Sequence, residues 1–488
     1  MTVEPFNLFS FKGKMGTLHL SWSAFFITFV VWFNAAPLLP AIATSLGVST
    51  ADLIVLATVN VAIAVPARVI IGMLTDRYGP RRTFALLLIF GALPCFWFAL
   101  ADSLAEAALA RFFCGAVGAG FVVGIRLVSE WFPSNELGTA EGIYGGWGNF
   151  GSAAAAFTLP AIALWVGGDD GWRWAVGFTG LLSLVYGVVF YALARDTPQG
   201  ATYYKPKHLG AMEVTSIGDL FLLCVMKLPL YLCLVLLAWR LSPAGFGLLG
   251  TTATHAIHAG IFALLLTDLH QAWRTNRGLL HTPVPAIHRY KFRQVAILNL
   301  LYLATFGSEL AVISILPLFF LQTFELSPVA AGMVASSYAF MNLMSRPAGG
   351  WLSDRFGRKK TLLVLTLGLA LGYLATSYID STWSVLAATL VVMCCSFFVQ
   401  SGEGAVFAAV PLIKRRLTGQ IAGMTGAYGN VGAVIYLLVL TYVDYSTFFL
   451  VIAITAFLGF LILFFMNEPE GQIAEINEDG SLALIQVG

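Results

Sequence analysis

Long stretches of hydrophobic residues, separated by short polar loops, run along almost the whole chain. Most hold about 18 to 25 apolar residues, enough for one helix to cross ~30 Å of hydrocarbon. Continuous runs favour helices over barrel strands, which alternate apolar and polar positions. Two weaker spans are predicted at 217–240 and 246–267. Twelve strong spans are predicted at 18–43, 51–74, 82–101, 104–132, 137–166, 172–194, 292–321, 327–351, 361–380, 383–409, 419–444 and 446–467.

The composition agrees with this pattern and excludes an ordinary water-soluble globule. Hydrophobic residues make up 58% of the chain and charged residues 11%, whereas soluble domains carry about 25% charged residues. Many basic residues lie in the loops, and no continuous patch for nucleic acid is present. We therefore expect an all-α polytopic protein of the cell (inner) membrane, surrounded by lipid bilayer.

Cofactor and metal chemistry find no support in the sequence. A phosphate-binding loop motif is missing, and the six cysteines show no metal-type spacing. His255 and His258 are three residues apart but have no thiolate or carboxylate nearby, which is a weak metal signal. We expect no cofactor, no metal and no nucleic-acid partner, and an enzyme is disfavoured because no nucleophile–base pair stands out.

Basic residues in the loops predict the orientation, because cytoplasmic loops hold an excess of Lys and Arg. The loops after the second, eighth and tenth strong spans read "DRYGPRR", "DRFGRKK" and "KRR". The loops on the other side carry few cations and several acidic residues. Both termini are therefore expected in the cytoplasm. The acidic residues of the other side are Asp52, Asp102, Asp169, Asp170 and Asp444.

The two halves of the chain repeat each other. "RVIIGMLTDRYG" at 68–79 matches "RPAGGWLSDRFG" at 346–357, and "GIYGGWGNFG" at 142–151 matches "GMTGAYGNVG" at 423–432. Duplicated halves of a membrane protein usually enclose a substrate site at their interface. We expect four regions: a six-helix bundle, a central insertion with two extra membrane helices, a second six-helix bundle, and an acidic, disordered cytoplasmic tail. Their ranges are 1–194, 195–291, 292–467 and 468–488.

These motifs resemble those of a known family. "GxxxDRxG" and its echo resemble the loop signature of the major facilitator superfamily, and the paired "GxxGxxGNxG" segments resemble the nitrate signatures of its nitrate/nitrite porter family. "GIRLVSEWFP", "GSELAVISILPLFF" and "SSYAFMNLMSRPAGG" are most similar to the cyanobacterial-type permeases. The resemblance implies the major facilitator fold of two pseudo-symmetric six-helix bundles. It also implies secondary active transport of nitrate and nitrite by alternating access.

Arg68 and Arg346 are the leading candidates for anion binding. Each precedes an aspartate of the repeated loop by eight residues, which places both ~12 Å into the membrane. A charge there costs at least ~2.5 kcal/mol and faces a cavity or the bundle interior. A guanidinium offers paired donors to a planar oxyanion. The alternative is that each arginine belongs to an internal salt bridge; the family resemblance supports a substrate role.

Aromatic, amide and glycine residues complete the expected site. The resemblance assigns stacking against the anion to Phe121, Tyr302 and Phe306. The glycine motifs would let a helix or the anion approach closely, and their asparagines would project amide donors toward the axis. Close helix packing without substrate contact is the alternative. The motif residues proposed to bind substrate are Gly148, Asn149, Gly429 and Asn430.

Glu309 is the candidate for proton coupling, because it follows Phe306 by about one helical turn. Its alternative role is that of a structural partner, for example of Arg126, which could instead pair with Glu130 four residues later. Glu403 is a weaker second candidate for coupling.

Charge pairs at the cytoplasmic helix ends, Asp76–Arg77 and Asp354–Arg355, are expected to form a gate. A purely topological role for the basic residues is the alternative. A proton-coupled nitrate and nitrite symporter is the leading hypothesis. Its rivals are a nitrate/nitrite exchanger and a non-transporting sensor of anions. The sequence leaves the oligomeric state open.

Overall fold

Helices account for most of the described chain, as the hydrophobic pattern predicts. A computed structural model describes residues 5–49, 56, 59–61, 63–168, 170–206, 210–245, 247–282, 284–476 and 482–486. Asp52, Asp169 and the start of the span expected at 51–74 lie outside the described residues. Within the described part, thirteen helices are long and apolar enough to cross a membrane.

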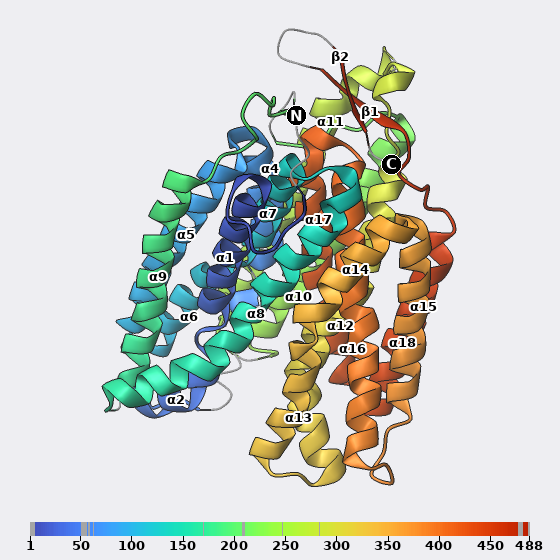
Figure 1. Cartoon of the computed structure of the whole chain (residues 1–488). Helices are drawn as coiled ribbons and strands as arrows, with labels where there is room; N and C mark the ends of the chain where they lie inside the picture. Colours follow the sequence, from blue (N-terminus) through green and yellow to red (C-terminus); the bar gives the residue numbers. More distant parts are fainter. Residues whose placement is uncertain are drawn as a thin grey trace.

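The first half of the chain folds into one bundle, here called the N-terminal half, at the left of Figure 1. A short 3-10 segment, Gly115–Ala119, joins its helices α6 and α7. The helices are α1 (Gly13–Phe33), α2 (Leu39–Leu46), α4 (Ala64–Tyr78), α5 (Pro80–Ala99), α6 (Leu104–Cys114), α7 (Gly120–Trp131), α8 (Ser134–Val166) and α9 (Gly171–Leu193).

A second bundle, the C-terminal half, stands beside the first (Figure 1). Its helices α13 and α14 follow each other end to end and together occupy the range expected for one span. The helices are α12 (Phe292–Phe324), α13 (Pro328–Phe340), α14 (Asn342–Phe356), α15 (Arg358–Ser377), α16 (Val385–Ala409), α17 (Thr418–Leu440) and α18 (Tyr445–Leu463).

Two helix pairs, α4 with α17 and α8 with α14, make the main contacts between the halves. Glycines allow their backbones to touch. A Cβ at Gly72 would lie 2.2 Å from the carbonyl oxygen of Gly419, and one at Gly350 would lie 1.9 Å from that of Gly138. Any side chain at Gly72 or Gly350 would force the pairs apart. The two arginines of interest therefore lie on helices that press directly against the opposite half.

The glycine that ends each repeated "DRxG" motif turns the chain from one helix into the next. Gly79 and Gly357 have φ values of 90° and 93°, a region that favours glycine. A carboxylate beyond the last helix of each half then accepts hydrogen bonds from the first N–H groups of the following helix. Asp196 does so for α5 at 2.7 Å, and Glu468 for α15 at 2.5 and 2.7 Å.

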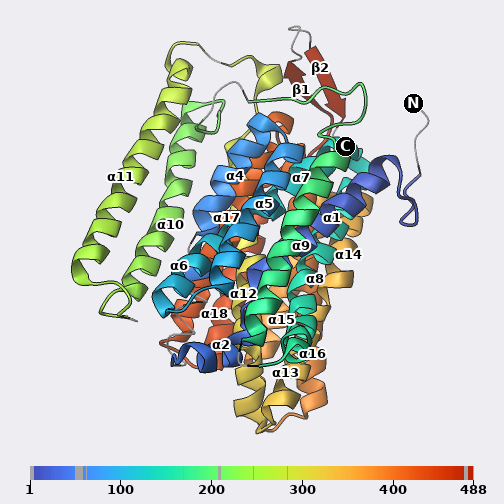
Figure 2. The same ribbon diagram turned by 90° about the vertical axis from the view of Figure 1, so that its left-hand side faces the viewer.

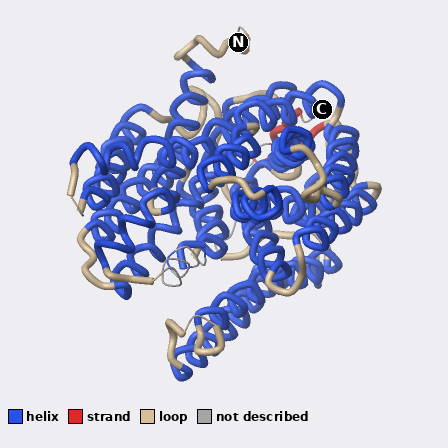
Figure 3. Tube along the Cα trace, turned by 90° about the horizontal axis from the view of Figure 1, so that it is seen from below, coloured by secondary structure: helices blue, strands red, loops and turns tan. Residues whose placement is uncertain are grey.

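The central insertion forms a helical hairpin of α10 (Ile217–Leu241) and α11 (Thr251–Asn276). It stands at one side of the two bundles (Figure 2) and projects from their rim when viewed from below (Figure 3). Helix α10 packs against α12, α17 and α4, whereas α11 packs chiefly against α10. The hairpin therefore touches both halves through one helix.

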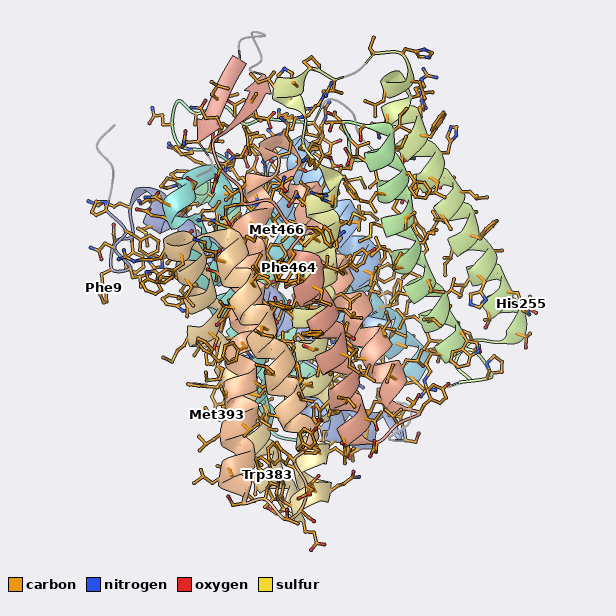
Figure 4. The ribbon with its side chains drawn as sticks, turned by 90° about the vertical axis from the view of Figure 1, so that its right-hand side faces the viewer. Phe9, His255, Trp383, Met393, Phe464 and Met466 are labelled. Carbon is orange, nitrogen blue, oxygen red and sulfur yellow. The ribbon has the colours of Figure 1, made fainter. Side chains whose placement is uncertain are left out.

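A partly buried ion pair joins the two helices of this hairpin. Lys227 Nζ lies 2.6 Å from Asp268 Oδ1, and the hydroxyl of Tyr231 donates to Asp268 Oδ2 at 3.0 Å. His255 lies near the end of the hairpin that is remote from the β-strands (Figure 4). Across the described chain, no group of three or more His, Cys, Asp or Glu residues is arranged to hold a metal.

The expected disorder of the acidic tail is wrong for two segments. β1 (Gln472–Ile476) pairs antiparallel with β2 (Leu482–Gln486), at the same end of the molecule as both termini (Figure 1) and opposite Trp383 (Figure 4). Glu475 is 1% exposed and lies 3.3 Å from Lys414 Nζ. Burial lowers the pKa of Lys414, and the neighbouring Glu475 opposes this shift. The contact between Lys414 and Glu475 holds β1 against the helical part of the protein. The hydropathy of the tail does not predict this strand.

The Lys227–Asp268 pair predicts a stability effect. We expect Asp268→Asn to lower the melting temperature in detergent by several degrees, because it leaves a cation without its partner among apolar side chains. Lys227→Met combined with Asp268→Leu should recover most of the loss. Circular dichroism melting of the purified variants measures both effects, and a double variant as unstable as the single one would contradict the explanation.

Candidate functional site

Two arginines from equivalent helices meet where the halves touch. Arg68 in α4 is 1% exposed and Arg346 in α14 is 2% exposed. Both guanidinium groups lie against the ring of Phe306, at 5.1 and 5.6 Å from its centroid. Two cations this close repel each other strongly in a medium of low dielectric. The arrangement therefore needs negative charge nearby.

The glycine motifs hold the arginine of the opposite half. A Cβ at Gly142 in α8 would lie 2.5 Å from the carbonyl oxygen of Arg346, and one at Gly423 in α17 would lie 2.5 Å from that of Arg68. The glycine three residues further along each motif lies against the arginine side chain itself. The glycines thus set the depth and direction of both guanidinium groups.

The two arginines have different partners. Arg68 donates to the backbone oxygens of Gly426 at 2.5 Å and Gly118 at 3.3 Å, and no described carboxylate lies within 4 Å of it. Arg346 donates to Glu403 Oε2 through Nε at 2.6 Å and also through Nη2. The alternative of an internal salt bridge therefore applies to Arg346 but not, in the described chain, to Arg68.

Glu309 lies beside this ion pair. Its Oε2 is 3.9 Å from Arg346 Nη2, and its Oε1 accepts from the amides of Asn342 and, at 3.4 Å, Gln400. Oε2 and the two amide oxygens have no hydrogen-bond partner. A proton on Oε2 would turn one of these three unpaired acceptors into a donor. Its spacing from Phe306 in the sequence made Glu309 a candidate. No sequence pattern indicated the amides of Asn342 and Gln400.

Arg126 is not the partner of Glu309. It lies 2.9 Å from Glu130, four residues along the same helix, and 3.5 Å from Asp76 in α4. Its remaining donors reach Tyr203, at 3.2 Å, and backbone oxygens. Of the two alternatives considered from the sequence, the local pair with Glu130 is the one that the structure contains.

Three aromatic rings form a column beside the arginines. Phe121 and Tyr302 have centroids 6.3 Å apart and Tyr302 and Phe306 5.1 Å apart, with interplanar angles of 6° and 9°. A planar ion between two rings needs about 7 Å, two contacts of ~3.5 Å, so the rings must separate to admit one. Phe407 in α16 packs edge-on against Phe121 and Tyr302. Sequence reasoning missed Phe407, one of 38 phenylalanines.

The paired asparagines are buried and retain unused polar atoms. Asn149 is 5% exposed and Asn430 is fully buried. Both amide atoms of Asn430 and the oxygen of Asn149 lack hydrogen-bond partners. The preceding glycines make room for rings: a Cβ at Gly148 would lie 1.9 Å from a phenylalanine of α1, and one at Gly429 2.6 Å from Phe306.

The aspartates of the repeated loops connect the two halves at the end that carries the termini. Asp76 accepts from the backbone N–H of Gly419 and of the next residue, both at 2.8 Å. Asp354 accepts from Gly138 and the next residue at 2.9 and 2.7 Å. Asp76 thus binds the first turn of α17, where free N–H groups favour an anion, whereas Asp354 binds the second turn of α8.

The arginines next to these aspartates do not take part in this contact. Arg77 and Arg355 are exposed. Two other arginines approach the carboxylates instead: Arg126 at 3.5 Å and Arg358 at 2.8 Å. Because neighbouring side chains on a helix point in different directions, Asp and Arg in "DR" cannot both face the opposite half.

Glu141 is a buried group that sequence reasoning overlooked. It is 2% exposed, and neither of its carboxyl oxygens has a hydrogen-bond partner. It lies in α8 between the Asp354 contact and the glycines that hold Arg346. A signal was present, because Glu141 is the single charged residue in the span predicted at 137–166.

The two bundles and the duplicated centre between them are typical of a membrane transporter. Comparison with known proteins identifies the family. The sequence profile of the Major Facilitator Superfamily matches residues 21–277 and 298–486. The chain is 47% identical to the nitrate/nitrite transporter NrtP of Picosynechococcus sp., over 97% of this chain and 96% of that protein. It is 44% identical to NrtP of Nostoc punctiforme, over the same shares. The chain therefore belongs to the nitrate/nitrite porter family of this superfamily.

Solved structures agree on the fold. The human organic anion transporter MFSD10 superposes with a TM-score of 0.63 at 14% identity, covering 93% of this chain and 100% of that one. The proton:xylose symporter XylE gives a TM-score of 0.60 at 14% identity, covering 93% and 96%. At this identity the similarity shows the fold alone, and it confirms the expected facilitator architecture.

The backbone contact between Gly350 and Gly138 leads to a prediction about a variant in which the two halves cannot close against each other. In Gly350→Ala the new methyl group would overlap the carbonyl of Gly138, so α8 and α14 should separate at this end and transport should fall by about tenfold or more. We expect faster thiol labelling of a Gln420→Cys reporter from that side. Gly332→Ala is the matched control, since a Cβ there meets nothing within 4 Å. Equal labelling and uptake in the two variants would refute this role of the contact.

Proposed function

We propose that this protein is a secondary active transporter of nitrate and nitrite, working by alternating access and coupled to protons. The observation that carries the proposal is the pair of buried arginines, Arg68 and Arg346, that lie against one aromatic ring at the contact between the halves. Guanidinium groups suit planar oxyanions because they offer parallel donors and keep their charge. The names of the NrtP relatives support the same substrates.

Alternating access is supported by where the contacts between the halves lie. Asp76 and Asp354 bind the opposite half at one end of the molecule, and the arginines lie further in along the same helices. With the termini in the cytoplasm, as the basic loops favour, this closed end is the cytoplasmic one. Breaking both aspartate contacts would let the halves rock and open the site inward.

The charges of the site support coupling to a proton. Arg68 and Arg346 carry two formal positive charges, and ionised Glu309 and Glu403 carry two negative ones, so the group is formally neutral. A bound monovalent anion adds one negative charge, and one proton restores neutrality. In a medium of low dielectric this favours joint binding of anion and proton. Glu309 is the better acceptor for the proton, because Glu403 is directly bonded to Arg346.

Exchange of nitrate for nitrite is the second candidate function. A relative in Bacillus subtilis, 25% identical over 91% of this chain and 92% of that protein, is a nitrite extrusion protein. Exchange needs no proton, because one anion replaces another and the charge of the site does not change. The two functions therefore differ in their response to a pH gradient.

The arginine pair is tested by lysine substitution. We expect Arg68→Lys and Arg346→Lys each to lower nitrate uptake into proteoliposomes by about 100-fold, since an ammonium cannot reproduce the planar pair of donors. Arg293→Lys, at an exposed arginine of α12, is the control and should transport normally. Near-normal uptake by both site variants would remove the arginines from the substrate role.

Substitution of Glu309 separates symport from exchange. Glu309→Gln should lose accumulation driven by an inward pH gradient and keep nitrate/nitrite exchange, because the amide preserves hydrogen bonding but cannot carry the proton. Glu403→Gln should impair both modes, since it removes the carboxylate that orients Arg346. Labelled nitrate fluxes with and without a pH gradient measure both modes. Gradient-driven accumulation by Glu309→Gln at the unaltered rate would exclude Glu309 from coupling.

A further inference from the structure

A cavity of 510 Å³ lies between the two halves and the central hairpin. Its walls come from the end of α1, from α6, from the last turns of α10 and α17, and from the middle of α12. These helix ends lie opposite the Asp76 and Asp354 contacts, on the expected extracytoplasmic side. Most of the lining is apolar, including Leu237 and Val434, but Arg111 is part of it.

Arg111 brings a positive charge into this wall that no described carboxylate within 4 Å balances. Its side chain is almost fully buried, at 3% exposure. Nη1 donates to Asn34 Oδ1 and Nη2 to the backbone oxygen of Trp32, both at 2.7 Å, whereas Nε has no partner. Neutral acceptors fix the direction of the guanidinium but leave its charge intact. A buried cation of this kind favours an anion beside it.

Trp32 links this cavity to the central arginines. Its indole ring lines the cavity and lies 5.8 Å from the guanidinium carbon of Arg68, while its backbone oxygen accepts from Arg111. The same ring packs against Gly118, where a Cβ would lie 3.0 Å away. Trp32 therefore contacts both arginines, the outer one through its backbone oxygen and the inner one through its ring.

We propose that Arg111 binds a small monovalent oxyanion in this cavity, forming an outer site from which the central site is loaded. The inference rests on the proposed transport function. Apolar walls favour a weakly hydrated single charge over a divalent anion, whose desolvation costs far more. Helix α10 completes the wall with Leu237, which gives the central hairpin a role in enclosing the outer site.

Nitrate binding to the purified full chain tests the outer site directly. In Arg68→Gln, which disables the central site, calorimetry should still detect nitrate binding. Adding Arg111→Gln should weaken the remaining binding by about tenfold or more, the effect of losing one charge-assisted contact. Adding Arg173→Gln instead should change nothing, because that arginine already pairs with Asp102 and Asp170. No binding in Arg68→Gln, or equal binding in the Arg111 double variant, overturns the proposal.

Uptake kinetics separate this inference from the proposed function. Arg111→Gln alone should raise the KM for external nitrate by about tenfold and leave the maximal rate within about twofold. Leu237→Trp fills the cavity from α10 and leaves the hydrogen bonds of Arg111 intact. It should also raise the KM, and it tests the outer site if Arg111→Gln does not fold. Unchanged KM in the variants that fold overturns the outer site. Failure of the unaltered protein to transport nitrate overturns the proposed function instead.

Discussion

Two positive charges held inside a membrane protein are the constraint on which the rest of the structure depends. Arg68 and Arg346 are buried against the same ring, where repulsion and desolvation both oppose their charge. The glycines of the opposite half press on the backbone of each arginine, so neither side chain can retreat without separating the halves. The contact that closes the protein is thus also the contact that keeps the cations together.

The halves balance this charge differently, although their sequences repeat. Arg68 donates hydrogen bonds only to backbone oxygens in the described chain, whereas Arg346 is bonded to Glu403 and lies near Glu309. Arg68 is therefore a cation without a carboxylate partner in the described chain. Arg346 belongs to a group with Glu403 and Glu309, and the net charge of that group changes when a carboxylate binds a proton. The pseudo-symmetry gives the two halves similar positions for donors. The difference between the halves gives the proposed coupling its site, where a bound proton would change the affinity for an anion.

The helices and the duplicated centre could be predicted because they rest on local patterns: apolar runs, and motifs repeated at fixed offsets. Partners from distant helices could not. Glu403 reaches Arg346 from 57 residues away, and no spacing rule relates them. The buried Glu475 depends on Lys414 in another loop, so hydropathy predicted disorder where a strand docks. At the predicted gate, Asp76 and Asp354 of the motif do contact the opposite half, but which arginines face them depends on helix rotation in the folded bundle.

The position of the central hairpin shows why a facilitator can tolerate an insertion between its halves. A helix that packed on one half alone would not affect how the two halves move relative to each other. Helix α10, however, contacts α4 in the first half and α12 and α17 in the second. The proposed rocking of the halves would slide α4 or α17 along α10, so the hairpin would constrain the path of that motion. Tyr428 of α17 donates to the backbone of Met226 in α10 at 2.7 Å, which ties the hairpin to the C-terminal half. In the proposed rocking motion the N-terminal half would move against the hairpin, and Trp32, Asn34 and Arg111, which all belong to that half, would keep their mutual hydrogen bonds.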